Sequence, residues 1–412
     1  MALNPIPWSE VKDLFELRRG PIQTLLSQPG VSWKAIKNIS DPVAELSGYK
    51  GVTIPSIVGA GHGVGAAFPA HKSMKFANPK FDIVDWYVRL EIDAKTQRIS
   101  KELIDAMLSV REEESVWHLN QMLFRDGSGI IAKVIDVAGD KSYITIAPVY
   151  CDDTVYPGAA DRYFRVGMLV DTYTSAGVAH DAGIQITAVD TVNHYLYGNW
   201  DDTAADDYIY LNLSKTYGEF VGFEGAIHES SVYGGVDPAD APVWKSVVLD
   251  LNNSALSAKI LLNFCAELNS ASPGASITHI ITSPAVAAAY SELFKESISM
   301  LLPSYEKKVA DIGIGGYKLT TPYAHWGKNG VIDIIADAMC TEGTMYFIAG
   351  DTWYHLVVDN FDWIPGEPEF GGIFRHAMVA EKDSLIALGV LHHTLYTKAR
   401  NANGKIKGIK IS

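Results

Sequence analysis

The stretch WYVRLEIDAKTQRISKELIDAMLSVREEESVWHLNQMLFRDGSGIIAKV, residues 86–134, passes from a strand pattern to a helix pattern and back to a strand pattern. Its first residues alternate between an apolar set, Trp86, Val88, Leu90 and Ile92, and a second set, Tyr87, Arg89, Glu91 and Asp93. This period of two predicts an antiparallel strand with one buried face.

A long helix is expected next, from Ser100 to about Phe124. Ser100 can cap it, and Glu102 in the first turn suits the positive end of the helix dipole. Most of an apolar stripe is formed by Leu103, Met107, Val110, Trp117 and Phe124. At about 1.5 Å per residue the helix would be roughly 37 Å long, which is more than an ordinary globular domain needs.

The loop Asp126-Gly127-Ser128-Gly129 joins this helix to the next strand. A phosphate-binding glycine loop precedes a helix, because the free N–H groups of the helix N-terminus point at the anion. This loop instead follows a helix C-terminus, whose carbonyl groups repel anions. We therefore expect a corner, in which Gly127 takes the left-handed conformation and Gly129 lets the chain turn into a strand.

Residues 130–225 read almost entirely as β. About six short strands with turn signals between them are expected, which is typical of a small barrel or sandwich. Residues 151–240 carry 15 Asp and Glu against 3 Lys and Arg, so most of the net charge of −14 lies here. This charge favours a solvated region, and the chain as a whole lacks the basic surface that grips nucleic acid.

The N-terminal part is expected to be an arm followed by a projecting loop. A short helix is predicted with Ser9 as its cap and Gly20-Pro21 as its end. Residues 51–71 contain no Asp, Glu, Lys or Arg, but they include five glycines and two prolines. Since a membrane-spanning helix needs about 20 apolar, helix-compatible residues, an extended two-stranded loop is the better interpretation.

From about residue 240 the pattern changes to mixed α/β. A helix is marked by Leu256, Ile260, Phe264 and Leu268, and a second helix begins at Ser283-Pro284 after the buried strand ITHIITS. Two hairpins are expected near the end of the chain, at Gly350-Asp351 and at Asn403-Gly404.

Composition indicates a folded protein of a reducing compartment. The chain has 412 residues, of which 48% are hydrophobic and 20% are charged, so it can bury a sizeable core. Cys151, Cys265 and Cys340 are odd in number and lack C-x-x-C spacing, so we expect no disulfide framework and no zinc site. The N-terminus has no charged start followed by an apolar core, so no signal peptide is expected.

Motifs for catalysis were sought and give no candidate catalytic, cofactor-binding or metal-ligating residue. Residues 59–65, GAGHGVG, miss the dinucleotide-binding spacing, and no P-loop, G-x-S-x-G or H-E-x-x-H is present. His392 and His393 would face opposite sides of a strand, and His62 and His71 lack a ligand partner at useful spacing. Solvated turns are the favoured interpretation of Asp201-Asp202 and Asp206-Asp207, with calcium binding the alternative. The sequence therefore predicts a protein that is not an enzyme.

The order of these elements resembles the tailed-phage major capsid proteins of the Hong Kong 97-like fold. The run VGAGHGVGAAFPAH…FDIVDWYVRLEIDAKTQRISKELID is similar to their extended loop feeding a spine helix, and LFRDGSGIIAKV is similar to the junction that follows it. ITHIITSPAVAAAYSEL is similar to the first strand–helix pair of their axial domain.

The resemblance implies an α+β fold with the following division of the chain: an N-terminal arm (1–50), an extended loop (51–80), the strand and spine helix of a peripheral domain (81–129), an inserted β-rich, barrel-like domain (130–225), an axial domain (240–365), and a C-terminal β segment returning to the peripheral domain (366–412). Many relatives lose an N-terminal segment during maturation. Because this sequence begins with Met1, we expect little or no processing.

The resemblance also implies a function. It implies a structural coat protein that self-assembles as hexamers and pentamers into the icosahedral head of a tailed bacteriophage enclosing double-stranded DNA. The implied partners are other copies of the chain, a scaffolding protein, a portal and a decoration protein, with weak, non-specific contact to DNA, no membrane and no cofactor. The implied location is the virion capsid, assembled in the cytoplasm of a host bacterium.

Two other functions stay open at the level of the sequence. The first is an encapsulin-like nanocompartment shell, which would share the fold and lack DNA. The second is a β-rich carbohydrate-binding protein or hydrolase, because Trp200 and the tyrosines of residues 195–210 stand beside carboxylates such as Asp202. The alternative role of these aromatic residues is to fill the core and rim of the small barrel.

Overall fold

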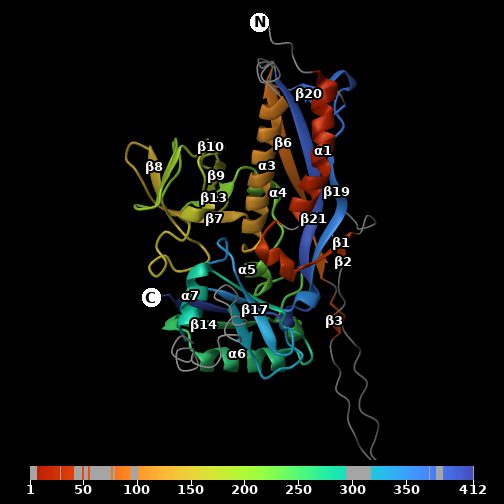
Figure 1. Ribbon diagram of the computed structural model, residues 1–412. Helices are drawn as coiled ribbons and strands as arrows, with labels where there is room; N and C mark the ends of the chain where they lie inside the picture. The colour runs from red at the N-terminus through yellow and green to blue at the C-terminus, as the bar shows by residue number, and fades with distance from the viewer. Residues whose placement is uncertain are drawn as a thin grey trace, which may run out of the picture.

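The computed structural model describes residues 7–27, 29–40, 49–50, 54–55, 76–77, 79–93, 101–293, 317–370, 372–376 and 384–411. They form an α+β structure with three large sheets, and the expected class is confirmed. Figure 1 shows one sheet and two long helices in an elongated unit, a separate β unit beside it, and an α/β unit below both.

The elongated unit is built on the strand pair β6 (Val84–Asp93) and β21 (Ser384–Thr397), which are antiparallel from Val84↔His393 to Asp93↔Ser384. The other edge of β21 holds β19 (Trp353–Trp363) and β20 (Phe374–His376), and β1 (Lys37–Ser40) lies parallel to β19. The expected alternation in β6 is confirmed, because Val88, Leu90 and Ile92 are buried while Tyr87 and Arg89 are exposed.

Two helices pack on this sheet. The expected long helix is α3 (Lys101–Met122), which lies against β6; it ends two residues before Phe124, and Ser100 lies outside the described residues. The N-terminal helix α1 (Trp8–Ser27) differs from expectation, because it continues through Gly20 and Pro21, and Ser9 lies in its first turn. Burial overrides the local stop signal. The helix buries Val11, Leu14, Phe15, Ile22 and Leu26 in the core of its own chain.

The corner after α3 is confirmed. Gly127 and Gly129 have φ of 85° and 83°, in the left-handed region. A Cβ on Gly127 would lie 2.8 Å from Cγ2 of Val221, so the close approach also requires glycine. The Asp126 carboxylate accepts hydrogen bonds from Ser128 N at 2.8 Å and from the Tyr150 hydroxyl at 2.9 Å, and these bonds fix the turn.

The β-rich unit is one sheet in the order β10-β9-β13-β7-β8-β12-β11. Its strands are β7 (Ile130–Val137), β8 (Tyr143–Ala147), β9 (Leu169–Tyr173), β10 (Ile184–Gln185), β11 (Ala188–Asp190), β12 (Tyr195–Tyr197) and β13 (Tyr208–Leu211). The two end strands are separated by two residues only. Ile186 N donates to Met168 O and Thr187 N donates to Tyr197 O, both at 2.9 Å. Residues 184–190 therefore close the sheet into a small barrel.

The α/β unit has the strand order β14-β22-β18-β15-β17-β16. These strands are β14 (Val247–Ala255), β15 (His279–Thr282), β16 (Tyr317–Thr320), β17 (Val331–Ala336), β18 (Met345–Ile348) and β22 (Gly404–Lys410). The predicted helices are α6 (Ala258–Ala271), with Ser257 Oγ accepting from Ile260 N, and α7 (Pro284–Leu293), with Ser283 Oγ accepting from Val286 N. The predicted start at Ser283-Pro284 is confirmed, whereas α6 begins at Ala258, so Leu256 lies before the helix that it was expected to mark.

Neither predicted hairpin forms. β18 lies in the α/β sheet while β19 lies in the elongated sheet, and β21 and β22 are divided between the same two sheets. Both turn signals therefore mark crossings between sheets. They meet at Asn403, which is fully buried and whose Oδ1 accepts from Ala349 N and Trp353 Nε1, each at 2.8 Å. Because β22 joins the α/β sheet, only β21 of the C-terminal segment lies along β6.

The limb that precedes β6 is two-stranded. β2 (Tyr49–Lys50) pairs with β5 (Lys80–Phe81), and β3 (Ile54–Pro55) pairs with β4 (Phe76–Ala77), both antiparallel. Figure 1 shows β3 farther than β2 from the elongated sheet. Most of residues 51–71 lie outside the described residues. In the part of the chain that is described, no helix is long and apolar enough to cross a membrane.

Candidate functional site: the polar junction of the three sheets

Three sheets meet where the chain leaves the barrel and returns to the end of α3. The short helix α5 (Phe223–Ala226) lies at this point, and Phe223 N donates to Leu123 O at 2.7 Å. A Cβ on Gly222 would lie 2.4 Å from Met122 O, so only glycine allows the backbones to come this close. The short helix is thereby fixed against the last turn of α3.

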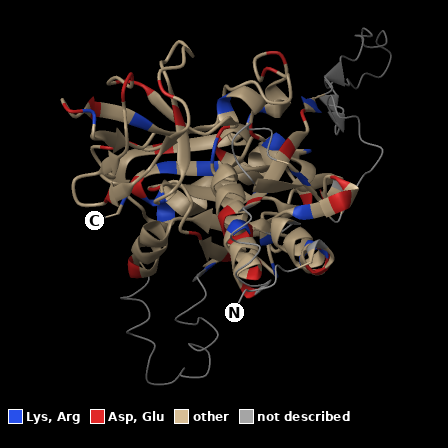
Figure 2. Ribbon diagram, turned by 90° about the horizontal axis from the view of Figure 1, so that it is seen from above, with Lys and Arg blue, Asp and Glu red and all other residues tan. Residues whose placement is uncertain are grey.

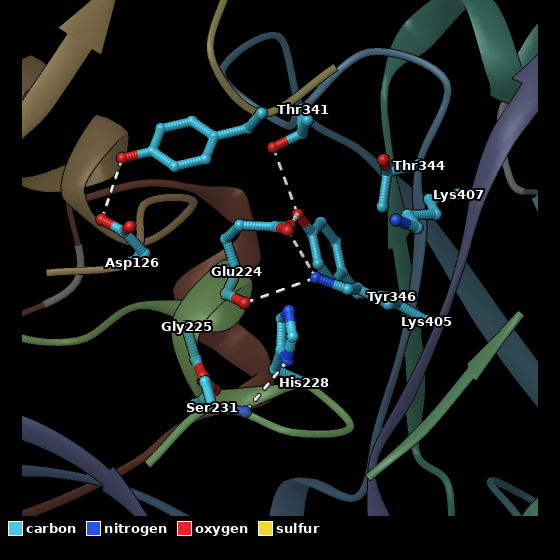
Figure 3. Close-up of polar contacts among 12 residues, drawn as sticks. Asp126, Glu224, Gly225, His228, Ser231, Thr341, Thr344, Tyr346, Lys405 and Lys407 are labelled. Atoms are coloured by element: carbon cyan, nitrogen blue, oxygen red, sulfur yellow. Dashed lines mark hydrogen bonds and ion pairs between the residues drawn. The ribbon is translucent and has the colours of Figure 1, made fainter. Parts of the chain in front are cut away.

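A buried ion pair connects α5 to the α/β sheet. Lys405 Nζ on β22 lies 2.5 Å from Glu224 Oε1, and 1% of the Lys405 side chain is exposed. The hydroxyl of Tyr346 on β18 lies 2.7 Å from Glu224 Oε2 and 3.1 Å from Thr341 Oγ1. Figure 3 shows these side chains converging on the Glu224 carboxylate. Burial raises the pKa of Tyr346 well above its ordinary value, so the phenol stays protonated.

Arg400, which follows β21, is the second cation of the junction. Its guanidinium is fully buried and donates to the carbonyl oxygens of Ala226, Ser231 and Gly225 and to Ser231 Oγ at 2.7 Å. Burial lowers the pKa of Arg400 to about 10, so it remains charged at neutral pH. The ring of His228 accepts from Ser230 N and Ser231 N at 3.1 Å, which shapes the same loop.

Two further buried networks tie other elements to this region. Arg125, at the end of α3, bonds Glu219 at 3.1 Å, and Ser214 Oγ donates to the same carboxylate at 2.7 Å. Ser32, in the 3₁₀ turn Val31–Ala35 of the arm, donates to Asp337 Oδ2 at 2.6 Å, and Asn120 of α3 donates to Oδ1 at 3.1 Å. The arm, the long helix and the α/β unit thus share one carboxylate.

The chemistry of the junction is structural. Lys405, Glu224, Tyr346 and Arg400 are side-chain types used in catalysis, but their polar atoms are engaged with each other or with backbone carbonyls. A catalytic group must reach a substrate, and these side chains are almost completely enclosed. The arrangement is suited to holding three sheets in one relative orientation.

The predicted orientation of the adjacent histidines is confirmed. His392 Nδ1 lies 2.5 Å from Asp85 Oδ1 on β6, whereas His393 Nδ1 lies 2.9 Å from His355 Nε2 on the buried side. His62 and His71 lie outside the described residues. Among the described residues, no three His, Cys, Asp or Glu side chains are grouped as they would be around a metal ion.

The Asp-rich turns of the barrel are occupied by internal bonds. Asp206 pairs with Lys133 at 2.6 Å, Asp207 bonds His180 Nδ1 at 2.6 Å, and Asp201 accepts from Asn199 at 2.7 Å. The backbone N of Asp202 donates to Asp181. Asp201, Asp202 and Asp206 are exposed, as expected of solvated turns, whereas Asp207 is buried with 3% of its surface exposed, so the expectation is wrong for Asp207.

Trp200 lies in the barrel core with no exposed surface, which matches the core role that the sequence left open for it. Its Nε1 donates to Leu196 O at 3.1 Å. Tyr143 and Tyr195 stack on the barrel with ring centroids 4.4 Å apart. Trp200 therefore offers no face to a sugar.

The three cysteines are free thiols. Burial raises the pKa of Cys151 and Cys265 to about 12 and that of Cys340 well above its ordinary value. At neutral pH these thiols are protonated and weak nucleophiles.

The surface shows mixed charge. In the view from above, several outer loops carry Asp and Glu, while Lys and Arg are scattered over different elements (Figure 2). A groove of about 510 Å³ lies between the barrel and the α/β unit, and Arg162 in its wall is bonded to Glu342 at 2.7 Å. The charge of Arg162 is therefore neutralised by a carboxylate of the same groove.

The junction residues were not found from the sequence. The terminal run TKARNANGKIKGIK was read as a turn and a strand, whereas Arg400, Asn403 and Lys405 are three of its buried anchors. In the sequence this run carries no signal that distinguishes Lys405 from a solvated lysine, because its burial depends on distant elements such as α5.

Comparison with known proteins gives similarity in structure only. No protein-family model matches the chain, and no curated protein matches it. The cyanophage A-1(L) capsid has a TM-score of 0.44 at 11% identity, covering 91% of each chain. The capsid of a native GTA particle has a TM-score of 0.42 at 6% identity, covering 94% of this chain and 90% of the other.

A third similar structure is the holo-SrpI encapsulin complex of Synechococcus elongatus, with a TM-score of 0.40 at 8% identity, covering 93% of this chain and 90% of the other. TM-scores below 0.5 at such identities support no conclusion about function. The case for a function therefore rests on the elements of the chain itself.

Proposed function

We propose that this protein is a shell subunit, the major capsid protein of a tailed bacteriophage with the Hong Kong 97-like fold. In this proposal residues 1–50 are the arm, 51–80 the extended loop, 81–129 the peripheral strand and spine helix, 130–225 the inserted barrel, 240–365 the axial domain and 366–412 the returning β segment.

The observation that carries the proposal is the two-stranded limb. β3 and β4 pair with each other through Ile54↔Ala77 and Pro55↔Phe76, and in the described chain no third strand joins them. An isolated two-stranded ribbon is marginal in water. A limb of this kind becomes stable when it lies on another molecule, and obligate interfaces bury on the order of 2,000–5,000 Å².

The junction supports the same proposal. A shell subunit transmits force between neighbours, so its sheets must keep one relative orientation. Glu224, Lys405 and Arg400 fix that orientation with buried, charge-assisted hydrogen bonds rather than with a mobile hinge. The role is structural, and we assign no catalytic residue.

The finer details of the proposal come from the resemblance. The subunits would form hexamers and pentamers in the virion capsid, with a scaffolding protein, a portal and a decoration protein as partners, and would be assembled in the host cytoplasm. A net charge of −14 suits a container for double-stranded DNA, because a basic inner wall would hold the phosphates and oppose packing and release.

The limb provides the test. Residues 56–75 are replaced by a Gly/Ser sequence of equal length, and assembly of the parent and the variant is compared by sedimentation and negative-stain microscopy, each with and without the neighbouring genes. The expected result is shells from the parent and folded, unassembled subunits from the variant. Val192→Ser, in a barrel turn with Val192 82% exposed, is the matched control and should still assemble.

Shells of normal yield from the limb variant would contradict the proposal that the limb makes the intersubunit contact. DNA inside parent particles made with the neighbouring genes would support a virus capsid. Shells that enclose a protein cargo and no DNA would instead support a nanocompartment.

A further inference from the structure

Two imidazoles form a buried pair in the middle of the elongated sheet. His355 on β19 and His393 on β21 are both without exposed surface, and Nε2 of His355 lies 2.9 Å from Nδ1 of His393. The rings meet edge to face, with centroids 5.1 Å apart. His355 is also opposite Asn38 of the arm strand β1 in the parallel register.

The hydrogen bonds fix where each proton lies. Asn38 Oδ1 is an acceptor 3.2 Å from His355 Nδ1, so this nitrogen carries hydrogen and donates. A neutral His355 then accepts at Nε2, and His393 Nδ1 must be the donor. His393 Nε2 is left as a lone pair that is buried and has no partner among the described residues. In both of these hydrogen bonds the donor is on the His393 side and the acceptor is on the side of the arm.

Among the described residues, no carboxylate is bonded to His393 and no acceptor is bonded to its Nε2, either of which could compensate a positive charge. Trp33 packs edge-on to His355, with ring centroids 4.9 Å apart, and Phe220 packs edge-on to His393, with centroids 5.4 Å apart. The charged and titratable groups on the neighbouring elements are Glu219, paired with Arg125; Asp337, bonded by Ser32 and Asn120; His392, directed at Asp85 on the other face; and Lys37, above the ring of Tyr354.

We propose that the His355–His393 pair is an acid-sensitive clamp that fastens the arm strand β1 to β19. The proton enters from solvent and binds the bare Nε2 of His393, which then carries a donor with no acceptor and a charge with no counter-ion. Phe220, which packs on His393, also packs edge-on to Trp33 of the arm turn, with ring centroids 6.0 Å apart, so opening of β1 and of this turn loosens the cover over His393. The arm is therefore released as the pair takes up a proton.

The direction of the pH effect follows from burial. Burial, and secondarily the neighbouring His355 and His392, lower the pKa of His393 well below its ordinary value. The closed state resists the proton, whereas the open state binds it below about pH 6.5. The bond between arm and sheet is therefore fully kept above about pH 6.5 and is weakened as the pH falls below that value.

Hydrogen exchange of the full-length, unassembled protein tests the clamp. Amide exchange is measured at pH 7.0 and 5.0 and is corrected for the chemical exchange rate. Protection of residues 31–40 should fall by about 25-fold, as expected for one imidazole with an ordinary pKa of about 6.5 in the open state. Protection of residues 258–271 in α6 should fall by a smaller factor, because α6 packs in a separate core cluster that contains neither His118 nor His393.

Two variants separate the clamp from other histidines. In His355→Gln/His393→Gln, which removes both titratable rings and keeps amide donors and acceptors, the excess loss of protection at residues 31–40 should vanish. In His392→Gln, whose parent side chain lies on the opposite face, it should be as in the parent. An unchanged loss in the double variant, or no excess loss in the parent, would overturn the proposal.

A measurement on the parent alone covers the case in which the double variant does not fold. Exchange of the imidazole C2 hydrogens, followed by mass spectrometry, gives a titration midpoint for each histidine. His393 should show a midpoint well below that of an ordinary imidazole. An ordinary midpoint for His393 while residues 31–40 stay protected would show that the closed state tolerates the charge, and the clamp would be refuted.

Discussion

Lys405 of β22 lies 2.5 Å from Glu224 of α5, and 1% of the lysine side chain and 15% of the glutamate side chain are exposed. A pair this deep is costly to form, but it is more costly to break from one side, because the remaining charge stays buried. The pair therefore tests whether the junction holds the sheets together.

We predict that Lys405→Met lowers the free energy of unfolding by about 3 kcal/mol, because it leaves the Glu224 carboxylate without its cation. Lys405→Met/Glu224→Gln should recover part of this loss. Urea unfolding of the unassembled subunit measures both. Lys407→Met is the matched control: Lys407 lies on the same strand, is 46% exposed and pairs with Asp250 at 3.2 Å. Its cost should be under about 1 kcal/mol. Equal costs at the two lysines would contradict the role of the junction.

The arm helix provides a second prediction. Because Phe15 is fully buried and its ring lies 4.7 Å from that of Trp363, Phe15→Ala should cost about 3–5 kcal/mol in subunit stability. Leu17, which is 74% exposed on the same helix, should tolerate Ala within about 0.5 kcal/mol. Thermal unfolding compares the two. Removal of residues 1–20 should for the same reason destabilise the subunit itself. An unaltered melting temperature would mean that α1 does not pack on its own chain.

At the corner, Gly127→Val should cost at least about 2 kcal/mol, since it combines a positive φ with a contact to Val221. Ser128→Ala removes two weak bonds, from Ile130 N at 3.3 Å and with the Tyr150 hydroxyl at 3.5 Å, and should cost under about 1 kcal/mol. Denaturant midpoints give both values. If the two variants were equally stable, the corner would not depend on the left-handed glycine.

His118 on α3 predicts a pH dependence of stability. Burial, with Arg125 and Arg165 nearby, lowers its pKa to about 3. The unfolded chain binds this proton below about pH 6.5, so the contribution of His118 to stability is complete above that pH and is lost as the pH falls. The slope is up to about 1.4 kcal/mol per pH unit. His118→Leu should reduce the difference between urea midpoints at pH 7 and pH 5. An unchanged difference would indicate that His118 is charged in the folded state.

The local patterns of the sequence predicted those elements whose cause is local. The alternation in β6 and the start of α7 at Ser283 follow from side-chain period and capping, and both are present. About six short strands with turn signals between them predicted a small barrel or sandwich, and the structure has seven strands. The closure of the barrel was not predicted, because it depends on residues 184–190. In this segment β10 pairs with β9, and β11 pairs with β12 two residues later.

The errors have a common physical reason. Pro21 and Gly20 stop a helix in isolation, but packing of Ile22 and Leu26 against the sheet maintains it. Asn403-Gly404 is a hairpin signal in isolation, but Asn403 is the buried polar link between two sheet crossings. The junction itself joins residues that are 181 positions apart, as in Lys405 and Glu224, and no local pattern encodes such a contact.

The measurement that tests the central claim most directly is the particle mass of the parent protein, expressed with its neighbouring genes and determined by sedimentation velocity and negative-stain microscopy. The account predicts closed, hollow particles of megadalton mass from the parent. It predicts folded single subunits from the variant in which residues 56–75, between β3 and β4, are replaced. A parent protein that stays a 412-residue monomer in every one of these samples would contradict the assignment as a shell subunit.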